Sequence, residues 1–173
     1  MKYREIAGEK ISVLGFGCMR FPTTSKNVED IDAEKSAKML EYAIENGVNY
    51  FDTAYVYHGG KSESFIGGVL KPYRDKIHIA TKCPTWEVKC EEDFDRLLNE
   101  QLERLQTDYI DFYLMHALDK DRFKNVVEKF NLIDKLNKAK ADGKIRHIGF
   151  SFHDDVETLK KIIDANPNWE FCQ

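Results

Sequence analysis

Short runs of β-branched and aromatic residues recur along the chain, and polar stretches of helical periodicity separate them. Such runs are typical of β-strands. The spacing of about 30 residues from one run to the next is that of a strand-helix-strand unit. The predicted strands are residues 13–17, 48–52, 77–81, 110–115, 145–150 and 169–173. Before the first of them, residues 3–13 are expected to form a small hairpin that turns near Ala7 and Gly8.

The stretches between the strands place apolar residues on one helical face. The two strongest stripes are Ala33, Ala37, Leu40 and Ile44, then Phe94, Leu98, Leu102 and Leu105. Weaker stripes are Val126, Phe130 and Ile133, then Val156, Leu159 and Ile163. Asp32 is expected to cap the first helix and Gly47 to follow its end, Ser62 to cap a short second helix, and Gly143 to stop the fourth helix after Asp142.

Alternation of strands and helices predicts an α/β fold with a parallel sheet and right-handed crossovers. A doubly wound sheet is the alternative, but residues 15–20 lack the third glycine of a phosphate-binding loop and open no helix. A (β/α)8 barrel of the triosephosphate isomerase type is therefore favoured. Such a barrel needs about 250 residues. Residues 1–173 are thus expected to form one partial barrel domain, truncated to about six strands and five helices.

The composition predicts an ordinary cytoplasmic protein. The net charge of −4 and the lack of a basic stripe argue against a nucleic-acid partner. The chain has no long apolar window and no signal-peptide pattern, which argues against a membrane partner and secretion. Cys18, Cys83, Cys90 and Cys172 are scattered, so neither a metal site nor a disulfide framework is expected. Cys83 directly follows Lys82 and is the one cysteine expected near a site.

Four residues lie at or just after the downstream ends of successive predicted strands: Asp52, Tyr57, Lys82 and His116. In a parallel barrel these ends converge on one mouth. Reduction of a carbonyl needs an external hydride donor and a proton donor for the oxygen. Tyr57 can donate that proton, and the ammonium of Lys82 is expected to lower the pKa of its phenol. Asp52 would hold Lys82, and His116 would orient the substrate oxygen.

Each of these four residues also has an ordinary structural explanation. Taken singly, they could be an exposed loop tyrosine, a surface lysine, a strand-end histidine and a turn aspartate. However, Asp52 and Lys82 directly follow apolar strand residues and are expected to be partly buried. A charge in such a position requires a partner. A mutual ion pair between them is therefore expected.

The motif Phe51-Asp52-Thr53-Ala54-Tyr55-Val56-Tyr57, followed in order by Lys82 and His116, resembles the aldo-keto reductase family. Gly15-Phe16-Gly17 and Ser62-Glu63 add to the resemblance, which spans essentially the whole chain. The resemblance implies a triosephosphate isomerase-type barrel and reduction of aldehydes or ketones with NADPH, or alternatively NADH. It also implies that Tyr57 is the general acid and that the other three residues support it.

The resemblance to the family is less complete at the positions that bind the cofactor. The matching positions are Gly17, Met19, Asp52, Ser151 and Gln173, whereas Phe152 stands where the family has an asparagine. The segments 149–153 and 57–60 resemble the bacterial branch of the family that often carries a C-terminal ferredoxin-like domain. In that comparison His58 occupies a position where many members have glycine.

Two functional hypotheses follow. The first is a reductase acting on a small carbonyl substrate, with an intact catalytic set and a half-encoded cofactor site. The second is a catalytically silent half-barrel, acting as an interaction module or an inactive fragment. Exposed barrel edges would allow self-association. An apolar substrate pocket is expected to draw on Trp86, Tyr55, Phe21 and Met19.

Overall fold

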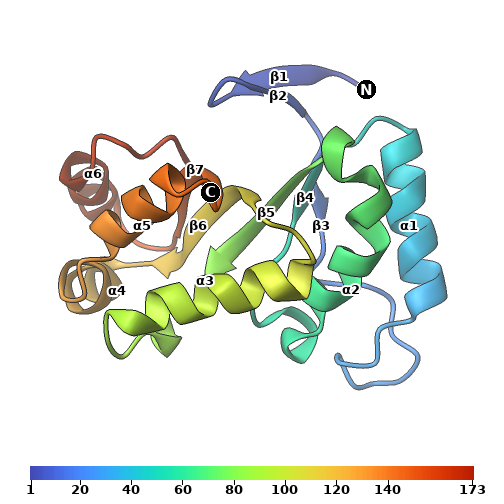
Figure 1. The fold of residues 1–173 in the computed structure, drawn as a ribbon, viewed down its shortest axis with the longest axis horizontal. Helices are drawn as coiled ribbons and strands as arrows, with labels where there is room; N and C mark the ends of the chain where they lie inside the picture. The colour runs from blue at the N-terminus through green and yellow to red at the C-terminus, as the bar shows by residue number, and fades with distance from the viewer.

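The computed structural model describes residues 1–173, and Figure 1 shows a curved parallel sheet with helices along its outer side. The six strands, in sheet order, are β3 (Phe16–Gly17), β4 (Tyr50–Asp52), β5 (His78–Cys83), β6 (Ile110–Leu118), β7 (Ile145–Phe152) and β8 (Phe171–Cys172). Their order in the sheet is their order in the sequence, as in a barrel wall. The predicted α/β barrel architecture, present here as a half-barrel, is confirmed.

Helices connect the strands. They are α1 (Ala33–Glu45), α2 (Ser62–Leu70), α3 (Glu92–Leu105), α4 (Lys120–Arg122), α5 (Leu132–Ala141) and α6 (Val156–Ala165). Shorter turns of 3-10 type are η1 (Tyr57–Gly60), η2 (Lys71–Lys76) and η3 (Thr85–Glu87), and η4 (Phe123–Glu128) is a π-helix. No helix of the chain is both long enough and apolar enough to cross a membrane.

The N-terminal hairpin forms as predicted. β1 (Tyr3–Ile6) pairs antiparallel with β2 (Glu9–Ser12), and both Ala7 and Gly8 at the turn have positive φ. Figure 1 shows the hairpin at one end of the sheet, beyond the N-terminal ends of the parallel strands. It therefore lies away from the strand ends that carry the candidate chemistry.

The predicted helix ends are confirmed at three positions and wrong at one. The carboxylate of Asp32 accepts a hydrogen bond from the Lys35 amide at 3.1 Å, while Gly47 and Gly143 have positive φ just beyond their helices. Ser62 does not cap α2, because it is the first residue of that helix. Its hydroxyl instead bonds the Thr53 hydroxyl at 2.8 Å, since both side chains are buried behind the end of β4.

The fourth predicted helix is divided in two. The stripe from Val126 to Ile133 predicts one continuous element, but Asn131 adopts φ 51° and separates η4 from α5. Asparagine tolerates this left-handed conformation better than most residues. The pattern of apolar residues cannot predict this break in the helix, because apolar residues are buried on both sides of it, Val127 before and Leu132 after.

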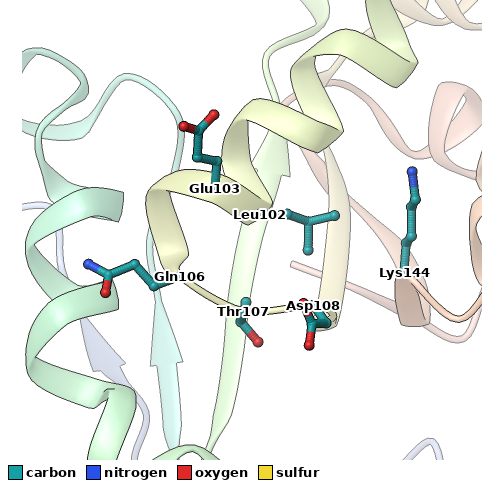
Figure 2. Close-up of a pocket in the computed structure, with 6 residues that line it drawn as sticks. All are labelled: Leu102, Glu103, Gln106, Thr107, Asp108 and Lys144. Atoms are coloured by element: carbon teal, nitrogen blue, oxygen red, sulfur yellow. The ribbon is translucent and has the colours of Figure 1, made fainter.

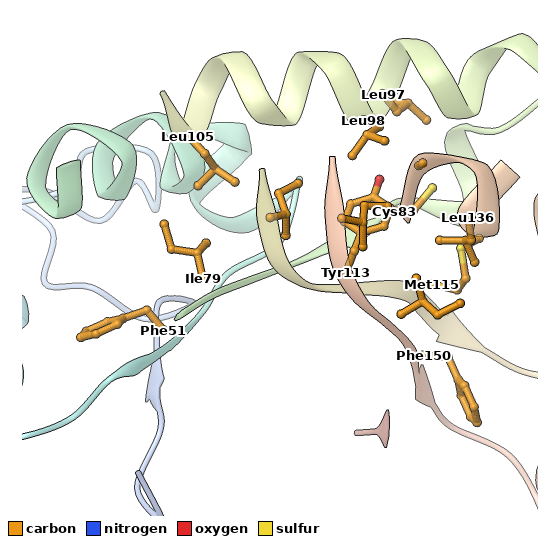
Figure 3. Close-up of a cluster of buried hydrophobic side chains, with 14 of the residues drawn as sticks. Phe51, Ile79, Cys83, Leu97, Leu98, Leu105, Tyr113, Met115, Leu136 and Phe150 are labelled. Carbon is orange, nitrogen blue, oxygen red and sulfur yellow. The ribbon is translucent and has the colours of Figure 1, made fainter. Parts of the chain in front are cut away.

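The strands alternate between two apolar clusters, as pleating requires. On β6, Tyr113 and Met115 face outward into the main core beneath α3, α5 and their neighbours, while Phe112 and Leu114 face inward. Figure 3 shows the outer cluster filling the space between the sheet and the helices, with Leu98 and Leu105 descending from α3. The inner face is the face on which side chains of a barrel converge.

Three strands, β5, β6 and β7, extend further at their carboxyl ends than predicted, whereas β3, β4 and β8 are shorter than predicted. The parallel ladder continues through Cys83 paired with Met115 and through Leu118 paired with Phe152. Lys82, His116 and Ser151 therefore lie within the last residues of β5, β6 and β7 rather than in the loops after them. The prediction ended these strands just before these polar residues. In a barrel, however, residues at the mouth can be polar and still belong to the hydrogen-bonded strand.

Candidate active site

The carboxyl ends of three adjacent strands place Asp52, Lys82 and His116 on the inner face of the sheet. Asp52 is the last residue of β4 and is two positions beyond Tyr50, whose ring packs against Phe112 in the inner cluster. By the same alternation, Lys82 lies two positions beyond Ala80 and His116 two positions beyond Leu114, and both Ala80 and Leu114 belong to the inner cluster. Strand pleating alone thus directs these three side chains into the same concave space.

Asp52 and Lys82 form the predicted ion pair. Lys82 Nζ donates to both carboxylate oxygens of Asp52 at 2.8 Å each and to the backbone carbonyl oxygen of Thr53 at 2.8 Å. Only 3% of the Lys82 side chain and 14% of the Asp52 side chain are exposed. Burial lowers the pKa of Lys82, and the nearby Asp52 carboxylate opposes that shift. An ammonium has three N–H donors, so these three contacts use all of them.

Tyr57 reaches the pair from the turn η1 that follows β4. Lys82 Nζ lies 5.1 Å from the centre of the Tyr57 ring, an arrangement in which the cation is attracted to the aromatic face. The expectation that Lys82 lowers the pKa of the phenol is wrong. Burial, followed by the negative charge of Asp52, raises the pKa of Tyr57. The charge of Lys82 does not outweigh these two effects, although the ammonium lies over the same ring.

His116 completes the set from β6. Its ring lies edge-on to Tyr57, with 6.3 Å between ring centres, and 5.0 Å from the ring centre of Trp86. Burial, with the positive charge of Lys82 in second place, lowers the pKa of His116 to about 4. The imidazole is therefore neutral at pH 7, and its buried Nδ1 has no hydrogen-bond partner within the chain.

A backbone irregularity lies next to His116 on β6. The pairing between β6 and β7 shifts register between Met115 and Leu118, and Ala117 has φ 54°. The Ala117 amide donates to the Ser151 hydroxyl at 2.7 Å, and the Thr85 hydroxyl donates to the carbonyl oxygen of His116 at 3.0 Å. Bulges of this kind are frequent next to active sites, where they redirect side chains.

The five residues predicted to bind the cofactor lie along the same strand ends. Gly17 pairs with Asp52 in the parallel ladder, and a Cβ built on Gly17 would meet no atom within 4 Å. Met19 follows with 54% of its surface exposed. Ser151 is buried beside the bulge, while Gln173 is exposed after β8, where its backbone bonds Phe150 and Phe152. The described contacts join Gly17 to Asp52 and Ser151 to the residue after His116, but they do not join the Gln173 side chain to the candidate site.

Two cysteines differ from expectation in their surroundings. Cys83 is buried in the outer core next to Tyr113 (Figure 3), because pleating turns it away from the face of Lys82. Cys18 is the cysteine close to the site, and burial with the charge of Asp52 raises the pKa of its thiol. Its position directly after Gly17 is the sequence signal that would have found it. No group of three or more candidate metal-binding side chains is arranged to hold an ion.

Of the predicted substrate-lining residues, Trp86 contacts His116 of the candidate set. The Tyr55 hydroxyl binds Glu100, and its ring lies 4.1 Å from the Arg104 guanidinium. Phe21 is buried against Phe65. Tyr55 and Phe21 therefore contribute to packing and to an ion-pair network. The sequence shows only that these positions are aromatic, which does not distinguish packing from substrate contact.

A depression of about 440 Å³ lies at the other end of the sheet. Figure 2 shows the residues around it, which come from the end of α3, the loop before β6 and the position just before β7: Leu102, Glu103, Gln106, Thr107, Asp108 and Lys144. These are the amino ends of the strands. In parallel barrels the residues that carry chemistry lie at the carboxyl ends. The depression is therefore not the catalytic mouth.

Comparison with known proteins agrees with this geometry. The model of the Aldo/keto reductase family matches residues 13–171. L-galactose dehydrogenase from Arabidopsis thaliana is 33% identical over 151 residues, which cover 83% of this chain and 46% of that protein. The solved holo form of an aldo-keto reductase from Bacillus halodurans is 30% identical with a TM-score of 0.78, covering 95% of this chain and 54% of that one.

A Klebsiella pneumoniae aldo/keto reductase solved with NADP and acetate is 26% identical, with a TM-score of 0.69, covering 87% of this chain and 49% of that one. The chain thus spans about half the length of the curated relatives it matches. The family match covers most of the chain and includes the strands that bear Asp52, Lys82 and His116. This chain belongs to the aldo/keto reductase family.

Proposed function

We propose that this chain carries the catalytic set of an enzyme that reduces aldehydes or ketones to alcohols with NADPH, or alternatively NADH. The observation that carries the proposal is the placement of Lys82, which is hydrogen-bonded to Asp52 and faces the ring of Tyr57, with the His116 ring edge-on to the Tyr57 ring. Family membership and the NADP-bound relative support the reaction class.

The residues at the strand ends fit a nicotinamide cofactor. The open space at Gly17 admits a flat ring against the end of β3, and the Ser151 hydroxyl still has its own proton to donate. Gly17, Met19, Asp52, Ser151 and Gln173 would hold this part of the cofactor. When bound, the cofactor supplies the hydride, a species that no side chain can provide.

The side chains of the chain divide the remaining work. Tyr57 is protonated at neutral pH, as a phenol with a pKa above 10.0 must be, so it can donate that proton to the substrate oxygen. The neutral His116 ring can donate one hydrogen bond to the same oxygen and orient it. Lys82 opposes the negative charge left on the phenolate after transfer, and Asp52 holds Lys82 in place.

The test is NADPH oxidation with a panel of aldehydes and ketones, followed at 340 nm. The wild-type chain should show a rate, and Tyr57→Phe should reduce it by at least about a hundredfold. Circular dichroism should show an unchanged fold in that variant. An unchanged rate in Tyr57→Phe would refute the assigned acid. A silent wild-type chain would favour the alternative of an inactive half-barrel.

We further propose that residues 1–173 form part of one barrel domain. We propose that this domain self-associates through the edges of its sheet and that it is located in the cytoplasm. β3 and β8 each have a strand neighbour on one side only, and such edges pair readily with other strands. The four free cysteines favour a reducing compartment. Sedimentation equilibrium tests the association, and cell fractionation tests the location.

A further inference from the structure

We propose that His58 is a positioning residue for Tyr57, which it holds by clamping the turn η1 to the loop between β3 and α1. The inference rests on the proposed function, since Tyr57 is the group whose position matters. His58 directly follows Tyr57 in the chain, and only 6% of it is exposed. It contacts neither the Asp52–Lys82 pair nor His116, so its effect would be transmitted through Tyr57.

Both ring nitrogens of His58 bind backbone of the same loop. Nε2 accepts a hydrogen bond from the Phe21 amide at 3.1 Å, and Nδ1 lies 2.5 Å from the carbonyl oxygen of Val28. Because an amide can only donate and a carbonyl oxygen can only accept, Nδ1 must carry the proton and Nε2 must not. The ring is therefore held as the neutral Nδ1–H tautomer. The Phe21 ring also packs on it, with 5.6 Å between centres.

The backbone of His58 has an unfavourable conformation, which the two hydrogen bonds of its ring must compensate. His58 has φ 54° and ψ 42°, the left-handed conformation, and Gly59 and Gly60 follow it with positive φ. For a residue with a side chain this conformation costs about 1 to 2 kcal/mol. Glycine would adopt it without that cost, so the side chain is retained against a local penalty. Two hydrogen bonds made in a buried position are of sufficient size to offset it.

The loop that His58 holds is itself tied to the catalytic strand. The Cys18 amide donates to the Asp52 carbonyl oxygen at 2.8 Å, and the Ser62 hydroxyl donates to the Cys18 carbonyl oxygen at 3.2 Å. One end of the loop is thus fixed to Asp52, and its middle is fixed to the residue after Tyr57. The loop is thus held both at Asp52 and at His58. We infer that these two attachments together set the direction of the Tyr57 ring over Lys82.

Three variants separate positioning from folding. His58→Gly removes both hydrogen bonds and relieves the left-handed backbone, so it should fold while freeing the turn. His58→Asn tolerates the same backbone and can still donate to Val28, so it should recover part of the loss. Lys61→Ala is the matched control, because it removes the exposed Lys61–Glu29 ion pair between the same two segments at 3.3 Å.

In the reductase assay, His58→Gly should lower kcat about tenfold to a hundredfold, the scale of a small misplacement of a catalytic group. The KM for the carbonyl substrate should change much less, His58→Asn should lie between Gly and wild type, and Lys61→Ala should match wild type. An unchanged kcat in His58→Gly, or an equal loss in Lys61→Ala, would overturn the proposal.

A second measurement does not require activity. Nuclear magnetic resonance of the isotopically labelled wild-type chain should show His58 as the Nδ1–H tautomer and slow exchange of the Phe21 amide. The ring signals of Tyr57 should shift in His58→Gly and stay in place in Lys61→Ala. If the wild-type chain proves inactive, the proposed function fails, but these spectra still decide the clamp. Unshifted Tyr57 signals in His58→Gly would refute it.

Discussion

The ammonium of Lys82 lies 2.8 Å from each carboxylate oxygen of Asp52, across the gap between neighbouring strands β4 and β5. With the Thr53 carbonyl oxygen as third acceptor, the ammonium is fully hydrogen-bonded before any ligand arrives. Its influence on Tyr57 is therefore that of a nearby charge and not that of a hydrogen-bond donor. Removal of either partner leaves the other buried and unpaired.

Lys82→Met should lower the free energy of unfolding by about 3 kcal/mol, because it leaves the Asp52 carboxylate uncompensated. The double variant Lys82→Met with Asp52→Leu should recover a large part of that loss, since no buried charge then remains. Urea unfolding monitored by tryptophan fluorescence measures both. Equal losses in the single and double variants would show that Asp52 carries no desolvation cost.

Tyr57 should ionise at higher pH than an ordinary tyrosine, because burial and the Asp52 charge raise its pKa above 10.0. The folded chain then holds this proton more tightly than the unfolded chain. The resulting contribution to stability is present below pH 10 and is lost as the pH rises through the folded pKa. A pH titration of ring-labelled tyrosine by nuclear magnetic resonance, assigned with Tyr57→Phe, tests this. A midpoint at or below pH 10 would contradict it.

His116 should make the chain less stable in mild acid. Its pKa is lowered from 6.5 to about 4, so the unfolded chain takes up a proton at pH values where the folded ring stays neutral. Its contribution is present above pH 6.5 and is lost as the pH falls toward the folded pKa. Between pH 7 and pH 5 the loss should be about 2 kcal/mol.

Urea unfolding at the two pH values, compared with His116→Phe, measures this contribution. The variant keeps a ring against Trp86 but cannot be protonated, so it should lack that part of the pH dependence. A wild-type slope in His116→Phe would show that His116 is not desolvated as described.

The sequence predicted the alternation of strands and helices and the hairpin, because strand runs and helical stripes are local properties. It also predicted that Asp52, Lys82 and His116 meet at one end of the sheet, because parallel strand ends converge in a barrel. It did not predict the left-handed Asn131 or the bulge at Ala117, since no local pattern requires them. It also assigned the wrong direction to the pKa shift of Tyr57. That direction depends on how far the phenol is buried and on its closeness to the Asp52 charge, which only the three-dimensional arrangement determines.

Two adjacent glycines in α2 should respond in opposite ways to substitution by alanine. A Cβ on Gly67 would stand 2.6 Å from the Arg104 carbonyl oxygen and 2.7 Å from backbone atoms of Leu105, where α2 crosses α3. Backbone cannot yield as a flexible side chain can, so Gly67→Ala should destabilise the chain by about 1 to 3 kcal/mol. A Cβ on Gly68 would meet only the end of the Gln106 side chain at 3.8 Å.

Gly68→Ala should therefore stabilise the chain by about 0.5 to 1 kcal/mol, because alanine loses less conformational freedom than glycine in a helix. Thermal unfolding by circular dichroism measures both variants under the same conditions. Since both substitutions raise helix propensity equally, the difference between them isolates the close approach of α2 to α3. If Gly67→Ala proved as stable as Gly68→Ala, the two helices could not be in backbone contact at this crossing.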